Sequence, residues 1–503
     1  MEKLINKKRE IIRDISIFSS GFYLGQAGYF LRGFLNASIL GPAMYGLWAA
    51  LNVILHFGFY AHLGVLHGMS REIPYLLGKG DKEKADRIRA SAFGFCLVAS
   101  ILVALSVVAV SLFFKKSLGL VGMIGIVTVA ILIVVQNAVN FYEMALSAVK
   151  RFSVIAIAYF LFPAMCVVLT FLLVTKWKIY GLYVVAVFGP LAILLFYYFN
   201  TRYRPDLRFD LRGLLRLIKI GFPLMTLLLF PLMLFTVDRI LIFKFLGATQ
   251  LGYYAFALLI CRSLVYLPMI VAKVIEPRLF HKYGETEKVE DLRRYLFVPT
   301  KALSIFFPLL IGIIYFVSSF IIRHFIADYT LSLSPLFILL FGKFFILFAP
   351  TVVSFFTAMN KQYRIIYFYL IAIFLSALLD ILVLTLGFGL IGVAVASGVV
   401  GFLLATSLFL YAASYYLKEW VDYFTTCARL YFPYVYILCF TLILNSIFFS
   451  NGVFLLDLLG VFLKICILIA VSMPFILHFN KEVHLFKEVA SIIRSKWSGR
   501  IKT

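Results

Sequence analysis

Long apolar stretches, each bounded by charged residues or by Gly and Pro, occupy most of the chain between residues 15 and 478. About 20 consecutive apolar residues suffice for one helix to cross the hydrocarbon core of a bilayer. The pattern predicts an all-α polytopic membrane protein with about 14 transmembrane helices. Short polar breaks within the longest stretches leave 12 or 13 crossings open. The predicted spans are 15–38, 43–66, 90–114, 118–143, 152–175, 179–200, 217–243, 249–275, 300–322, 331–358, 364–386, 388–412, 429–450 and 453–478.

The composition agrees with this pattern. Of the 503 residues, 63% are hydrophobic and 14% are charged, whereas a soluble domain has about 45–50% apolar and about 25% charged residues. A soluble core of this length could not bury so much apolar surface. Disordered chains, coiled coils and secreted disulfide scaffolds are therefore excluded. The six Cys form no C-x-x-C pair, so we expect neither a metal site nor a cofactor.

The positive charge follows the membrane topology. With a cytoplasmic N-terminus, 36 of the 47 Lys and Arg residues fall in inner segments and 6 in outer ones. This bias predicts cytoplasmic N- and C-termini and an even number of spans in the plasma (inner) membrane. The net charge of +24 is thereby explained without a nucleic-acid partner.

All connections between the predicted spans are too short for a soluble catalytic domain, so we do not expect the protein to be an enzyme.

The inner segment 204–219 has the pattern of a helix that lies in the membrane interface. Arg208, Arg212, Arg216 and Lys219 recur at helical spacing, with leucines on the other side. Such a stripe favours anionic lipid at the cytoplasmic face. This segment either only fixes the orientation of the chain in the membrane or also recruits the substrate.

Two segments repeat one another. LGPAMYGLWAA (40–50) and LGATQLGYYAF (246–256) match at an offset of 206 residues, which predicts two pseudo-symmetric halves of six spans each. Because six is even, both halves enter from the same side, as in a parallel repeat. The expected organisation is an N-terminal six-helix lobe (1–200), a cytoplasmic interfacial linker helix (201–219), a C-terminal six-helix lobe (220–412), two additional transmembrane helices (413–478) and a basic cytoplasmic tail (479–503).

These motifs carry a resemblance to a known family. LGPAMYGLWAA, VDRILIFKFLGATQLGYYAFA (237–257), EPRLFHKYGETEKVEDLRR (276–294) and GLIGVAVASGVVGFLL (389–404) resemble, in order, the polysaccharide biosynthesis/O-antigen flippases of the multidrug/oligosaccharidyl-lipid/polysaccharide exporter superfamily. The resemblance implies a V-shaped fold of two lobes. It also implies that a polyprenyl-pyrophosphate-linked oligosaccharide moves from the inner to the outer leaflet by alternating access, for cell-surface polysaccharide assembly. Glycan polymerases or glycosyltransferases of the same pathway are then possible partners.

Ionisable residues within spans are costly and therefore usually face protein or water. A pyrophosphate headgroup needs cations when it leaves water, and Arg binds phosphate oxygens in a bidentate manner. We expect Arg32, Arg239 and Arg262, followed by Lys343, to contact the headgroup, with Asp238 beside them. The alternative is that each Arg pairs with an acid and stabilises the fold.

Other intramembrane charges suggest different roles. Asp380 is the most isolated acid and is a candidate site for coupling transport to protons or another cation, with a buried, protonated structural Asp as the alternative. Asp457 and Lys464 lie seven residues apart in the last span and should share a helix face.

Two other functions remain open. A flippase for the peptidoglycan lipid precursor would need the same chemistry. A drug or cation exporter of the same superfamily would favour acids in its cavity, whereas the spans here hold five bases and four acids.

Overall fold

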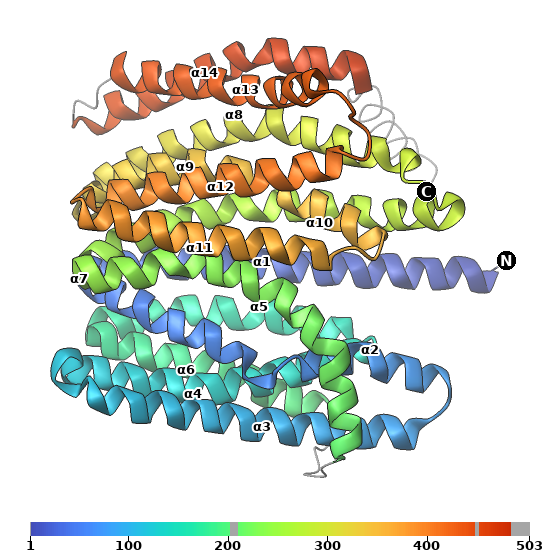
Figure 1. Ribbon diagram of the computed structural model, residues 1–503. Coiled ribbons are helices and arrows are strands. Elements are labelled where there is room, and N and C mark those ends of the chain that lie inside the picture. Colours follow the sequence, from blue (N-terminus) through green and yellow to red (C-terminus); the bar gives the residue numbers. More distant parts are fainter. Residues whose placement is uncertain (1, 202–209, 448–451, 484–503) are drawn as a thin grey trace. The chain divides into compact units, whose positions relative to one another are not determined.

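The computed structural model is almost entirely helical in the described residues, which are 2–201, 210–447 and 452–483. No strand occurs in this part of the chain. Short 3-10 or π-helical turns at 59–62, 170–174, 290–292 and 327–332 join some of the helices. The α-helices (Figure 1) are α1 (Glu2–Gly58), α2 (Val65–Gly78), α3 (Lys82–Phe113), α4 (Lys115–Ala148), α5 (Phe152–Leu169), α6 (Thr175–Asn200), α7 (Leu211–Thr286), α8 (Arg293–Phe325), α9 (Leu333–Ile346), α10 (Ala349–Ala358), α11 (Tyr363–Thr385), α12 (Gly389–Ala413), α13 (Trp420–Ile447) and α14 (Phe454–Val483).

Eleven helical segments among the described residues are long and apolar enough to cross a membrane. The predicted polytopic, all-α membrane fold is thus confirmed, while the number of 14 crossings stays a prediction. Three of these segments are much longer than the roughly 20 residues that one crossing needs. Each contains one residue with left-handed backbone, namely Gly41 (φ 71°), Lys178 (φ 50°) and Gly247 (φ 84°). The three segments are Ser20–His62, Phe152–Asn200 and Leu211–Leu264.

The two repeated motifs break their helices at equivalent places. Gly41 and Gly247 are the second residues of LGPAMYG and LGATQLG, and both adopt positive φ, which glycine tolerates without steric strain. The motifs also pack against each other reciprocally. A Cβ on Gly46 would lie 1.8 Å from the Ala248 carbonyl oxygen, and a Cβ on Gly252 would lie 1.9 Å from that of Pro42. Helices α1 and α7 can therefore approach so closely only because both contact positions are glycine.

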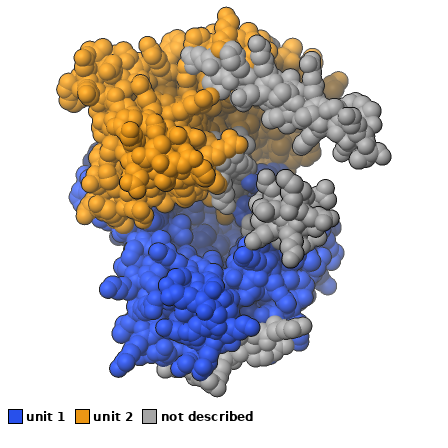
Figure 2. All heavy atoms as spheres, turned by 90° about the vertical axis from the view of Figure 1, so that its right-hand side faces the viewer, with its two compact units in different colours: residues 1–259, 369–390 blue, residues 260–368, 391–503 orange. Residues whose placement is uncertain are grey.

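The chain divides into two compact units, which we describe separately (Figure 2). Unit 1 comprises residues 1–259 and 369–390, and unit 2 comprises residues 260–368 and 391–503. A buried apolar cluster of unit 1 joins α2, α3, α4, α5 and α6 to the start of α7. Its fully buried side chains include Val65, Met69, Ile73, Ala85, Ala92, Phe141, Ile155, Ala158, Tyr197 and Leu217.

In unit 2, α8 packs against both α13 and α14. Helices α9 and α12 approach closely at a pair of glycines, since a Cβ on Gly342 would lie 2.9 Å from the Cα of Gly398. Aromatic rings join α9 to α13, with Phe344 stacked on Tyr434 at a centroid distance of 4.3 Å. These helices thus form a tightly packed scaffold.

The basic segment before α7 is only partly described, because Arg208 lies outside the described residues. From Leu211 onward this segment is continuous with α7 rather than a separate helix. Its Arg216 guanidinium lies 2.7 Å from the carboxylate of Glu72 on α2, a buried side chain. The two groups are close enough to form an ion pair. Their geometry is not that of a hydrogen bond, because Glu72 Oε1 accepts none among the described residues. One of the four predicted lipid-facing cations is thus paired with protein.

Candidate functional site

Asp238, on α7, is a buried carboxylate with two hydrogen bonds. Its side chain is 5% exposed. The Tyr254 hydroxyl donates to Oδ2 at 2.5 Å, and the backbone N–H of Arg239 donates to Oδ1 at 2.8 Å. Tyr254 lies beyond the Gly247 kink of the same helix, so the kink brings the two side chains together. Both carboxylate oxygens are therefore partly satisfied by the protein.

Asp380, on α11, is a second buried carboxyl group in the same unit. The residue is 0% exposed. The Ser376 hydroxyl donates to Oδ2 over a long 3.4 Å, and Oδ1 has no hydrogen-bond partner among the described residues. The carboxyl groups of Asp380 and Asp238 are close enough to interact electrostatically. The structure thus brings together two acids that the sequence placed on separate helices.

A buried pair of carboxylates is unstable as two free negative charges, because the low dielectric both removes hydration and strengthens repulsion. A single positive charge near either carboxyl group removes most of this instability. Such a charge can be a proton or a small cation with oxygen ligands. No group of three or more His, Cys, Asp or Glu side chains suited to a metal ion occurs among the described residues. A cation at Asp238 and Asp380 would therefore need further oxygen ligands of other kinds.

Two arginines predicted to bind the headgroup lie in the same unit as this acid pair. Arg32 on α1 and Arg239 on α7 are both half-buried. Each has a buried Nε–H with no hydrogen-bond acceptor among the described residues. Arg32 is also close enough to Cys166 of α5 for an electrostatic interaction. A guanidinium with an unused buried N–H is suited to donate a hydrogen bond to an anionic oxygen of a ligand.

The other two predicted cations lie in unit 2. Arg262 is exposed on the last part of α7. Lys343 on α9 is half-buried and lies near the Cys261 thiol. The six predicted residues are thus divided between the units, with Arg32, Asp238, Arg239 and Asp380 in unit 1.

Two further intramembrane acids hold helices together. Glu143 of α4 accepts a hydrogen bond from the hydroxyl of Tyr159 on α5. Asp457 of α14 is hydrogen-bonded to His324 of α8 at 2.9 Å. These acids serve the packing of their own units.

Sequence reasoning missed Tyr254 and Ser376. Tyr254 is part of the repeated LGATQLGYYAF motif, but only the kink at Gly247 shows that it turns back toward Asp238. Ser376 precedes Asp380 by one helical turn, a spacing that allows a local hydrogen bond. The second residue could have been found from the sequence, whereas the first required the structure.

The kinked helices, the buried charges and the repeated glycine contact define an all-helical, multi-pass membrane protein. The family model described as polysaccharide biosynthesis protein matches residues 36–335. The chain therefore belongs to this family, as the sequence resemblance predicted. No curated protein matches the chain by sequence.

Solved structures share the fold at low sequence identity. A structure described as the lipid II flippase MurJ in an inward closed conformation aligns with a TM-score of 0.68 and 18% identity, over 93% of this chain and 99% of that chain. An inward-facing multidrug resistance MATE family transporter of the MOP superfamily aligns with a TM-score of 0.61 and 17% identity, over 78% of this chain and 94% of that chain. A MOP superfamily transporter from Pyrococcus furiosus, described with a reverse polarity of its binding pocket, aligns with a TM-score of 0.54 and 16% identity, over 83% of this chain and 96% of that chain. The predicted exporter fold is thereby confirmed.

Proposed function

We propose that the protein is a flippase that moves a polyprenyl-pyrophosphate-linked oligosaccharide from the inner to the outer leaflet by alternating access. The observation that carries this proposal is the match of residues 36–335 to the polysaccharide biosynthesis family. The transporter-type fold supports it. Translocation of an intact lipid forms and breaks no covalent bond, so the proposal requires no catalytic residue or cofactor.

In this proposal the cations contact the pyrophosphate. Arg32 and Arg239 supply the buried Nε donors described above, and Arg262 and Lys343 supply further positive charge. Charge-assisted hydrogen bonds to phosphate oxygens offset the loss of hydration as the headgroup enters the protein. Asp238 keeps its own hydrogen bonds and sits directly before Arg239, where it limits the net charge of the site.

The acid pair serves as the coupling site in the same proposal. Asp380 alternates between a state that holds one cation or proton and a state that has released it, in the electrostatic field of the nearby Asp238. Because the electrostatic energy of the pair differs between these states, ion binding can favour one conformation over another. Unit 1 contains both residues, so this coupling begins within one unit.

The proposed topology places both termini in the cytoplasm of the plasma (inner) membrane, with anionic lipid at the cytoplasmic face. The uneven distribution of Lys and Arg supports this orientation. The lobes, the additional C-terminal helices and the tail are proposed with the bounds predicted from the sequence, whereas the linker from Leu211 onward is the first part of α7. Polymerases or glycosyltransferases of the same pathway are proposed partners.

Deletion of the gene tests the proposed function. The expected result is loss of surface polysaccharide together with accumulation of its lipid-linked precursor, because the precursor no longer reaches the outer leaflet. Unchanged surface glycan without accumulated precursor would refute the proposal. Loss of viability with accumulation of the peptidoglycan precursor would instead favour that substrate.

A specific observation favours a second candidate function. The buried pair of Asp238 and Asp380 could attract an organic cation as well as a coupling ion. The two acids are therefore also consistent with a protein that exports cationic drugs. Increased sensitivity of the deletion strain to cationic compounds, with normal surface glycan, would identify this function.

A further inference from the structure

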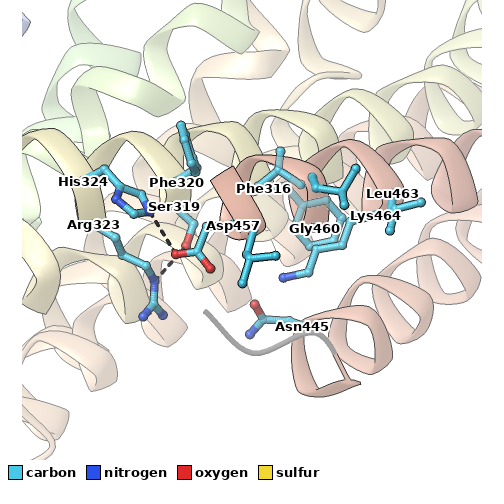
Figure 3. A pocket seen from close by; sticks show the side chains of 13 residues that line it. Phe316, Ser319, Phe320, Arg323, His324, Asn445, Asp457, Gly460, Leu463 and Lys464 are labelled. Carbon is cyan, nitrogen blue, oxygen red and sulfur yellow. Dashed lines mark hydrogen bonds and ion pairs between the residues drawn. The ribbon is translucent and has the colours of Figure 1, made fainter. Parts of the chain in front are cut away.

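Unit 2 contains a cavity of about 400 Å³ that is lined by none of the residues proposed to act in transport. Helices α8, α13 and α14 form its walls. Figure 3 shows polar side chains from α8 and α14 reaching into it, with Asn445 of α13 at one side. The polar and charged residues that line it are Ser319, Arg323, His324, Asn445, Asp457 and Lys464.

The only acid in this lining is already engaged. Asp457 is hydrogen-bonded to His324 at 2.9 Å, and this pair ties α14 to α8. Of the two lining cations, Arg323 has one long contact of 3.5 Å from its Nε to the Ser319 hydroxyl. Neither Arg323 nor Lys464 forms an ion pair within 4.0 Å among the described residues. The cavity therefore holds more positive charge than its acid neutralises.

The cation on α14 is held in apolar surroundings. The Lys464 ammonium lies 5.4 Å from the centroid of the Phe316 ring, and its side chain is half-buried. Lys464 is close enough to Arg323 to be repelled by it and close enough to Asp457 to be attracted by it, although Asp457 is shared with His324. An anion bound between Lys464 and Arg323 would offset this repulsion. It would also supply charged oxygen acceptors, whereas among the described residues Arg323 has only its long contact to Ser319.

We propose that this cavity binds the phosphate group of a lipid, with Arg323 and Lys464 as its two cationic contacts. The apolar lining by Phe316, Phe320 and Leu463 favours an amphiphile over a free ion. The outer face of α14 beside the cavity is apolar and exposed, with Leu455, Leu459 and Phe462 each more than half exposed. Acyl chains can lie along this face while the phosphate enters the cavity. The site needs no role in transport, so it stands independently of the proposed function.

Lipid binding to the purified full-length protein in a neutral detergent tests this site. The probes are a labelled phosphatidylglycerol, an uncharged diacylglycerol with the same chains, and inorganic phosphate. The expected result is saturable binding of about one phosphatidylglycerol that the diacylglycerol does not displace. Lys464→Met and Arg323→Gln should each weaken this binding about tenfold or more, since each removes a charge-assisted hydrogen bond.

Two further variants separate binding from folding. Lys464→Arg retains the charge and should retain binding, and Lys115→Met removes an exposed cation from α4 in unit 1 and should leave binding unchanged. Equal weakening by Lys115→Met would overturn the proposal, as would unchanged binding in both cavity variants. Saturable binding of inorganic phosphate without binding of phosphatidylglycerol would overturn the lipid as the ligand.

Discussion

The carboxyl group of Asp380 is fully buried and poorly satisfied by hydrogen bonds. It has one long hydrogen bond from Ser376, and Oδ1 has no hydrogen-bond partner among the described residues. The sequence alone identified Asp380 as a candidate functional residue, because an ionisable group in an apolar span is costly. Its proximity to Asp238 was not recognisable, since the two acids lie on different helices with no spacing that relates them.

At this scale we predict that Asp380→Asn uncouples transport from its driving ion. The amide has nearly the same size as the carboxyl but cannot gain or release a charge. The transport rate of the wild-type protein should respond to an imposed gradient of Na⁺, K⁺ or H⁺, whereas the variant should respond to none. Transport assays in vesicles with each gradient in turn provide the measurement. A variant that keeps the full response would remove Asp380 from the coupling site.

The repeated motif shows how far a pattern in the sequence predicts an element. The match at an offset of 206 residues predicted two equivalent halves, and Gly41 and Gly247 both adopt positive φ at matching positions. The reciprocal contact of Gly46 and Gly252 could not be predicted, because sequence similarity does not show that two copies touch. Likewise, the charge pattern of 204–219 did not reveal that Arg216 faces Glu72 rather than lipid.

The glycine contact gives a prediction about stability. A Cβ at Gly46 would overlap the backbone oxygen of Ala248, which cannot rotate away, so Gly46→Ala should separate α1 from α7. We expect a loss of about 1–3 kcal/mol or more, as for other overpacked contacts, visible as a lower melting temperature in detergent. Gly284→Ala is the matched control, because nothing lies within 4 Å of its Cβ position. Equal melting temperatures for both variants would contradict this packing.

The ion pair between α2 and α7 gives a second prediction. Arg216→Gln leaves the buried carboxylate of Glu72 without its cation. Because Arg216 is half exposed, we expect a moderate destabilisation of about 1–3 kcal/mol. Thermal unfolding of the purified protein measures it. Arg212→Gln removes an exposed cation one turn earlier in α7 and should have little effect. A greater loss in the Arg212 variant would show that lipid contacts outweigh the ion pair.

For the whole molecule, hydropathy and family motifs predicted the membrane fold correctly. The apolar stretches correspond to eleven candidate spans among the described residues, three of them long and kinked. The substrate could not be predicted at this scale, because transporters that share one fold differ in what they carry. The intramembrane charges narrow the choice of substrate. The buried Arg donors favour an anion, and the two buried acids favour a cation.

Transfer of lipid-linked glycan between leaflets tests the central claim most directly. Purified protein in sealed vesicles should make an inner-leaflet polyprenyl-pyrophosphate oligosaccharide accessible to an outside enzyme that modifies the glycan. Arg239→Gln should slow this transfer about tenfold or more, because it removes a charge-assisted contact to the pyrophosphate. Lys115→Gln, which alters an exposed cation of α4, should transfer at the wild-type rate. Absence of transfer by the wild-type protein with every lipid-linked glycan tested would contradict the assignment as a flippase.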